Sequence, residues 1–135
     1  MGVCISATNS NYKFHLSYSG FKYVRQMIAD KFDLDFGSLY RKLSTIPYGV
    51  SYAEFKEQSE SDYAAIEKLV ANKNLDQDIV DFLFLEDIGG SINYKTCRKL
   101  AAVITGMPDD FTFEYAKFRE FLMECYSHRR NMRWY

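Results

Sequence analysis

Arginines and aromatic side chains near the C-terminus are the residues of this sequence best suited to bind another molecule. Arg129, Arg130 and Arg133 are followed by Trp134 and Tyr135. A guanidinium group can bind phosphate or carboxylate through two parallel hydrogen bonds, and an aromatic ring offers a stacking face. These residues favour an anionic, nucleotide-like ligand or an acidic protein partner. The alternative is structural, with basic residues stabilising a helix end and the tryptophan packed in a final strand.

Two glycine-containing segments could offer backbone N–H groups to an anion. Tyr18, Ser19 and Gly20 lie at a predicted junction between a strand and a helix, and Gly89–Gly90 precede a helix that carries Arg98. Free N–H groups at a helix start favour phosphate. Neither segment matches the GxxxxGK[ST] or GxGxxG phosphate-binding motifs. A turn followed by an N-cap is the alternative at both places.

Cysteine and histidine give little support for catalysis or metal binding. Cys125 and His128 are three residues apart on a predicted helix, a spacing that lets a nucleophile and a base meet. Cys125 also completes the apolar stripe of that helix, which favours burial. The chain has three cysteines and no CxxC pair, so neither a disulfide framework nor a zinc ribbon is predicted. We expect reduced thiols, no metal and no cofactor.

Two acids, Glu86 and Asp87, stand at the C-terminal end of a predicted apolar helix. The helix dipole disfavours negative charge there, so the sequence predicts either a basic partner from elsewhere in the fold or a contact with a ligand. A small hydrolase that uses one of these acids for proton transfer is the least favoured of three functional hypotheses. The structural pairing is preferred.

The N-terminus matches the M-G-x-x-x-[ST] pattern of N-myristoylation, with Cys4 placed for a second acyl chain. Val3, Cys4 and Ile5 fit a buried first strand equally well. Because firm anchoring needs two membrane signals, the strand is preferred over lipidation.

Composition excludes several classes of protein. The chain has 135 residues, 47% hydrophobic and 26% charged, which fits one globular domain spanning residues 1–135. A formal net charge of -1 argues against a dedicated binder of duplex nucleic acid, although a local basic patch remains compatible with it. No apolar run is long enough for a transmembrane helix, and no signal peptide is recognisable, so we expect a cytoplasmic protein without membrane contact. The oligomeric state stays open, and a homo-oligomer is compatible with the sequence.

Hydrophobic periodicity predicts a mixed α+β fold that is predominantly helical. Residues 3–6 and 12–17 read as two strands of an N-terminal hairpin, and residues 132–135 could add a third strand to it. Apolar residues at helical spacing follow from residue 21. We therefore expect five to six helices packed on a small antiparallel sheet.

Five later segments carry the remaining helical patterns. The first is a short helix that stops before Pro47 and has one apolar stripe of Phe36, Leu39, Tyr40 and Leu43. Residues 51–73 are rich in polar helix formers and indicate an exposed helix, whereas residues 79–85 are apolar almost all round and indicate a core helix. A further helix is predicted from about residue 93 to residue 105, and the last begins near Asp109 and Asp110, whose charges suit a helix start.

The sequence resembles a poorly characterised set of small proteins from Gram-positive bacteria and their phages. The matching segments span most of the chain: Gly-x-Cys near the start, Tyr18-Ser19-Gly20-Phe21 with Val24-Arg25 and Ile28-Ala29, Asp81-Phe82-Leu83, Tyr94-Lys95-Thr96-Cys97-Arg98-Lys99-Leu100, Ala116-Lys117-Phe118-x-x-Phe121, and Met132-x-Trp134. Small phage accessory proteins are often non-enzymatic binders that block or sequester something the host uses for defence. The resemblance therefore implies such a binder, without a family activity to transfer.

Together these patterns predict a non-enzymatic protein that holds an anionic, nucleotide-like ligand. The predicted ligand-binding residues are Tyr18, Ser19, Gly20, Arg25, Arg98, Arg130 and Trp134. Backbone and hydroxyl donors would come from the first three, phosphate contacts from the arginines, and a stacking plane from the indole. The alternative is an inhibitor or immunity-type factor that binds a host protein through exposed tyrosines and the acidic segment 54–67.

Overall fold

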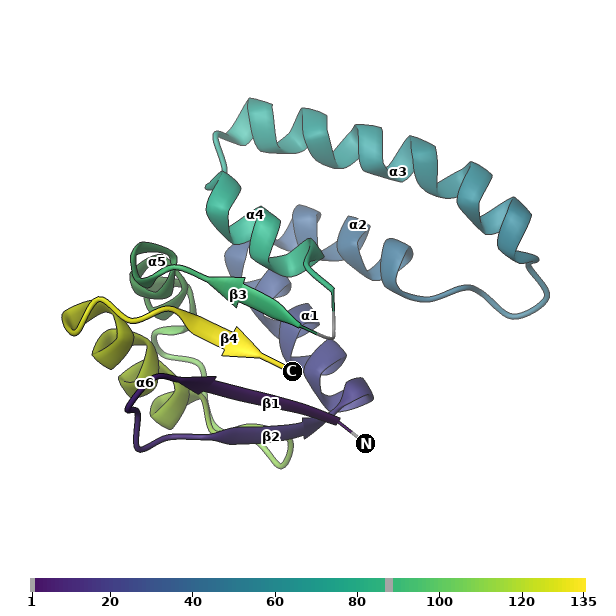
Figure 1. The fold of residues 1–135 in the computed structure, drawn as a ribbon. Helices are drawn as coiled ribbons and strands as arrows, with labels where there is room; N and C mark the ends of the chain where they lie inside the picture. Colours follow the sequence, from purple (N-terminus) through teal and green to yellow (C-terminus); the bar gives the residue numbers. More distant parts are fainter. Residues whose placement is uncertain (1, 87–88) are drawn as a thin grey trace. The chain divides into compact units, whose positions relative to one another are not determined.

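The structure, a computed structural model, describes residues 2–86 and 89–135. Over these residues it contains six helices and a four-stranded antiparallel sheet, which confirms the predicted α+β, mainly helical class (Figure 1). Intramolecular contacts group into two compact units. The first unit runs from the N-terminus to Arg25 and from Asp78 to the C-terminus, and the second spans Gln26–Gln77.

The sheet belongs to the first unit and has the strand order β2-β1-β4-β3. Its strands are β1 (Gly2–Ala7), β2 (Phe14–Ser17), β3 (Gly90–Ile92) and β4 (Met132–Trp134). The predicted N-terminal hairpin and the predicted C-terminal strand are both confirmed. The sequence prediction missed β3, which pairs with β4 at the edge of the sheet.

The two faces of the sheet differ because side chains alternate along each strand. Val3, Ile5 and Trp134 are buried on one face, where helices of the first unit cover them. On the opposite face His15 and Arg133 are exposed. Burial of Val3 and Ile5 supports the strand interpretation of the N-terminal motif.

Helices α4 (Gln77–Phe84), α5 (Tyr94–Ile104) and α6 (Tyr115–Ser127) complete the first unit together with the start of α1 (Tyr18–Phe32). Aromatic contacts fix α6 against the sheet, since the ring of Phe14 lies 5.5 Å from those of both Phe118 and Phe121. The predicted core helix is confirmed as α4, with Ile79, Val80, Phe82 and Leu83 buried.

The start of the last helix was predicted several residues too early. Helix α6 begins at Tyr115, and the Asp109 side chain still accepts a hydrogen bond from the N–H of Ala116 in its first turn, at 3.0 Å. Asp110 instead accepts hydrogen bonds from the N–H groups of Thr112 and Phe113, both at 2.8 Å. Asp109 therefore serves as a cap from outside the helix, while Asp110 closes the preceding turn.

Arg25 is a buried cation at the centre of the first unit. Its guanidinium lies over the ring of Phe21, 4.3 Å from the ring centre, and 5.7 Å from that of Trp134. It donates hydrogen bonds to the carbonyl groups of Leu83, Leu85 and Glu86, which follow or end α4. These carbonyls form the negative end of the helix, so the arginine stabilises that end through the backbone. The sequence predicted a basic partner for the Glu86 and Asp87 carboxylates, and the Glu86 side chain is exposed.

The second unit contains the later part of α1 with α2 (Leu34–Ser44) and α3 (Tyr52–Lys73). Asp33 caps α2 by accepting a hydrogen bond from the N–H of Phe36 at 2.9 Å, and it pairs with Lys73 at 3.0 Å. Burial opposes ionisation, but the cap and the lysine hold the pKa of Asp33 below its ordinary value. Most of α3 is exposed, as predicted.

We predict that Gly90→Ala destabilises the protein by about 1–3 kcal/mol, the usual cost of overpacking a core. A Cβ at this position would overlap the six-membered ring of the Trp134 indole, which is 1% exposed and held on all sides. Urea denaturation measures the loss. Thr8→Ala, at an exposed position in the turn after β1, is the control, and equal midpoints for both variants would contradict the packing described.

Candidate functional site

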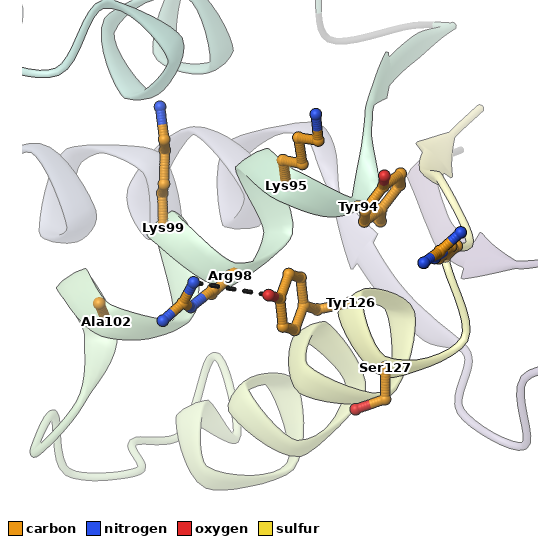
Figure 2. A pocket seen from close by; sticks show the side chains of 8 residues that line it. Tyr94, Lys95, Arg98, Lys99, Ala102, Tyr126 and Ser127 are labelled. Atoms are coloured by element: carbon orange, nitrogen blue, oxygen red, sulfur yellow. Dashed lines mark hydrogen bonds between the residues drawn. The ribbon is translucent and has the colours of Figure 1, made fainter.

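A hollow of about 750 Å³ lies between α5 and the C-terminal end of α6 (Figure 2). We refer to it as the α5–α6 hollow. Its lining residues are Tyr94, Lys95, Arg98, Lys99, Ala102, Tyr126, Ser127 and Arg129. Four of these eight side chains are cationic, two are tyrosines and none is acidic, so the hollow combines positive charge with aromatic surface.

The two tyrosines and Arg98 form the aromatic part of this hollow. The rings of Tyr94 and Tyr126 are 6.3 Å apart between centres, with an angle of 35° between their planes. Arg98 and Tyr126 point toward each other in Figure 2, and the guanidinium lies 5.2 Å from the ring centre. A long hydrogen bond of 3.5 Å joins the guanidinium to the tyrosine hydroxyl. This contact orients both groups at the surface.

The pattern of α5 explains why its cations face outward. Cys97, Leu100, Ala101 and Ile104 form the buried stripe of the helix, which leaves Arg98 and its neighbours on the solvent side. Asn93 caps the helix by accepting a hydrogen bond from the N–H of Thr96 at 2.9 Å. Lys95 lies in the first turn of the helix, near the positive end of the helix dipole, and no acid in that turn offsets the positive charge. Such an arrangement favours an anion nearby.

Arg129 reaches the α5–α6 hollow from the end of α6. Its N–H donates to the carbonyl of Tyr126 at 3.2 Å, and the N–H of Arg130 donates to that of Cys125 at 2.8 Å. This pair of hydrogen bonds is the Schellman motif, whose left-handed position is usually glycine. Here that position is Arg129, with a φ of 53°. The chain thus holds an arginine in a backbone conformation that glycine adopts more easily.

Neighbouring acids neutralise only part of the positive charge. Lys99 pairs with Asp78 at 2.7 Å, where both side chains are about half exposed. Surface pairs of this kind contribute only about 0–1 kcal/mol, so an anionic ligand can compete with the aspartate. Lys95 lies 6.0 Å from the ring centre of Tyr94. Positive charge therefore remains available at the hollow.

The residues predicted from sequence do not form one site. Arg98 lines the α5–α6 hollow, and Arg130 lies just beyond it, donating hydrogen bonds to the carbonyl of Asn9 and to Glu124. Arg25 and Trp134 are only 3% and 1% exposed. The indole N–H donates to the carbonyl of Glu86 at 2.9 Å, so the ring is part of the core and offers no stacking face. Phosphate contact by Arg25 and stacking by Trp134 are therefore corrected to structural roles.

Tyr18, Ser19 and Gly20 form the first turn of α1. The Ser17 hydroxyl accepts a hydrogen bond from the N–H of Gly20 at 3.0 Å, so a side chain caps the helix. Ser19 is engaged with the same hydroxyl at 3.1 Å. None of the three lines the α5–α6 hollow. These residues therefore form a turn with an N-cap, which was the alternative to anion binding in the sequence analysis.

The other chemical candidates are placed as follows. Cys97 and Cys125 meet inside the first unit, 0% and 1% exposed, and His128 is at the surface. Glu86 has an exposed side chain, and Asp87 lies outside the described residues. Among the residues that the structure describes, no three histidine, cysteine or acidic side chains are grouped closely enough to hold a metal ion.

Comparisons with models of protein families, with characterised proteins and with solved structures give no match to this chain. None of the described helices is both long and apolar enough to cross a bilayer. The geometry of the α5–α6 hollow is therefore the feature of the molecule that bears on function.

Sequence reasoning missed Tyr94 and Tyr126 as site residues, and it named Arg129 in the C-terminal basic group without including it among the predicted ligand-binding residues. Tyr94 and Arg98 are four residues apart on one predicted helix, a spacing that places them on the same face. This spacing was visible in the sequence, and neither residue belongs to the apolar stripe of that helix. The contribution of Tyr126 required knowledge of which face α6 presents to α5, which the pattern of a single helix does not contain.

We predict that Cys4 reacts with iodoacetamide in the native protein well before Cys97 or Cys125. Cys4 is partly exposed, whereas burial keeps the reagent from Cys97 and Cys125, which are 0% and 1% exposed. The thiolate is the reactive form, and the hydrogen bond with Cys125, together with burial, also raises the pKa of the Cys97 thiol. Peptide mass spectrometry after timed labelling identifies the order. In urea all three should react, and native labelling of Cys125 as fast as Cys4 would instead indicate a reactive nucleophile.

Proposed function

We propose that this protein is a non-enzymatic binder of an anionic, nucleotide-like ligand, which it holds in the α5–α6 hollow. The observation that carries the proposal is the lining, in which four cations and two tyrosines occur without an acid. Phosphate pairs with guanidinium and ammonium groups, and a nucleobase stacks on an aromatic ring. The hollow therefore offers groups for both the phosphate and the base of a nucleotide.

Stacking and charged hydrogen bonds at these residues should each make a measurable contribution to the binding free energy. Stacking of a base on an aromatic side chain contributes about 1–3 kcal/mol, and a hydrogen bond to a charged group about 1.5–3 kcal/mol. Tyr126 and Arg98 are within contact of each other, so a single ligand can engage both. The loss of either group should weaken binding roughly tenfold, since 1.4 kcal/mol corresponds to a factor of ten.

Binding without turnover is supported by the chemistry of the lining. It supplies ammonium, guanidinium, phenol and hydroxyl groups, and no carboxylate, imidazole or thiol is among the residues that line it. General acid–base catalysis relies most often on the missing groups. In line with the resemblance to small proteins of Gram-positive bacteria and phages, we propose that the protein sequesters a nucleotide-like signal of the host.

We predict that nucleotides raise the melting temperature of the protein and that Arg98→Gln weakens their binding about tenfold. A ligand that binds only the folded state stabilises it by mass action. A thermal-shift screen with nucleoside monophosphates, followed by isothermal titration of the best one, provides both measurements. Tyr126→Leu should weaken binding similarly, whereas Tyr126→Phe should retain it because the stacking face survives.

Lys117→Gln is the matched control for Arg98→Gln. It removes one exposed positive charge from α6 and lies outside the hollow, where the lysine pairs with Glu114 at 3.2 Å. Its dissociation constant should equal that of the unchanged protein. Equal weakening by both substitutions would assign binding to overall charge, and binding of inorganic phosphate as tightly as of any nucleotide would contradict the stacking role.

We predict that Arg129→Gly lowers nucleotide affinity roughly tenfold while leaving the melting temperature of the free protein unchanged or higher. Glycine suits the left-handed backbone at this position better than arginine does, so a purely structural role predicts no loss on substitution. Calorimetric titration and thermal unfolding of the same sample separate the two effects. Full affinity in this variant would remove Arg129 from the site.

A protein partner is the second candidate, and exposed side chains of the second unit favour it. Tyr48 and Tyr52 are fully and largely exposed in the loop before α3 and at the start of that helix, next to Ile46. The exposed part of α3 that follows contains the acidic segment 54–67, which suits a host protein with a basic surface. Failure of every nucleotide to shift the melting temperature would favour this surface over the α5–α6 hollow.

A further inference from the structure

A second, smaller hollow of about 350 Å³ lies on the outer face of the sheet. We call it the Arg133 hollow. Its lining residues are Thr8, Ser91, Arg129, Arg130, Asn131 and Arg133. It contains three guanidinium groups with hydroxyl and amide groups, and neither an aromatic ring nor an acid. Such a lining suits phosphate and offers a base no surface on which to stack.

Strand register places the groups of this hollow. Arg133 is the exposed middle residue of β4, flanked by buried Met132 and Trp134, and it pairs across the sheet with Ser91 of β3. The hydroxyl of Ser91 donates to the carbonyl of Met132 at 3.2 Å, so its proton is used within the sheet and the guanidinium groups are the main donors of this hollow. Alternation along β4 therefore fixes the guanidinium outside the core, on a rigid element.

The three arginines differ in whether their side chains have partners within the protein. Arg130 donates to the carbonyl of Asn9 at 3.1 Å and pairs with Glu124 at 3.4 Å. No ion pair or side-chain hydrogen bond of Arg129 or Arg133 is found within the described part of the chain. These two guanidinium groups can therefore bind a ligand without first losing a partner.

Arg129 belongs to the lining of both hollows. The α5–α6 hollow offers the stacking tyrosines, and the Arg133 hollow offers only cationic and polar groups. The two hollows thus adjoin at Arg129, and the first of them carries the aromatic rings.

We propose that the ligand carries more than one phosphate group, with its base on Tyr94 and Tyr126 and its further phosphates in the Arg133 hollow. This inference rests on the proposed function and narrows the ligand class. Nucleoside triphosphates and short single strands of nucleic acid share the required chemistry. A nucleoside monophosphate has its single phosphate close to the base and engages the first hollow alone.

The test compares AMP, ATP and a single-stranded adenosine tetranucleotide by isothermal titration, in buffer without divalent cations. ATP or the tetranucleotide should bind at least tenfold more tightly than AMP. Arg133→Gln should lower the affinity for these polyphosphate ligands roughly tenfold and leave AMP binding unchanged. The affinity of the tetranucleotide should also fall with salt by a slope of roughly 0.7 for each phosphate bound.

Controls separate this inference from the proposed function. Lys117→Gln should bind all three ligands as the unchanged protein does. If AMP binds and loses affinity with Arg98→Gln, yet ATP and the tetranucleotide bind no more tightly, the second hollow is unused and the inference fails alone. If no ligand binds, both fail. Tighter binding of ATP only, or of the tetranucleotide only, supports the inference and identifies the source of the phosphates.

Discussion

The burial of Arg25 among aromatic rings is the interaction on which the rest of the first unit depends. A charged group inside a protein is costly unless hydrogen bonds and neighbouring charges compensate it. Here the carbonyl groups at the end of α4 accept from the guanidinium, and the Trp134 indole N–H binds one of the same carbonyls. The end of α4, the middle of α1 and strand β4 are therefore joined by one group of hydrogen bonds. The ring of Trp134 then leaves no room for a side chain at Gly90, where β3 begins.

Whether a cation of this unit faces the core or the solvent decides its role. Arg25 faces inward and stabilises a helix end, whereas Arg98 is directed outward by the apolar stripe of α5. Arg129 differs from both because it occupies the left-handed position that closes α6. Glycine would satisfy the backbone there with less strain. Under the proposed function, the long cationic side chain at that position serves the ligand and not the fold.

Sequence patterns predicted the elements well and the assembly of the site poorly. The alternation in the N-terminal hairpin and the helical spacing of residues 79–85 depend on local periods, which the fold preserved. Trp134 was misplaced because its proximity to arginines in sequence was taken as proximity in space. In a strand, however, Met132 and Trp134 share one face and Arg133 takes the other. Applying that period to the C-terminus would have separated the indole from the available guanidinium group. The pairing of Tyr94 with Tyr126 needed the contact between two helices, which local patterns do not encode.

The net charge of the whole chain conceals the electrostatics of its parts. Residues 26–77 contain nine acids and six bases out of the total of 18 and 17, which leaves nine acids and eleven bases for the unit that carries both hollows. An overall charge of -1 is therefore compatible with one positive unit and one negative unit. Because screening limits the reach of surface charge to about 8–10 Å at moderate salt, a ligand responds to the local set of groups. At the two hollows that set is cationic without lining acids. A net charge of -1 thus disfavours the long continuous positive surface that a duplex requires, and it is compatible with the short anion that we propose to bind at Arg98, Arg129 and Arg133.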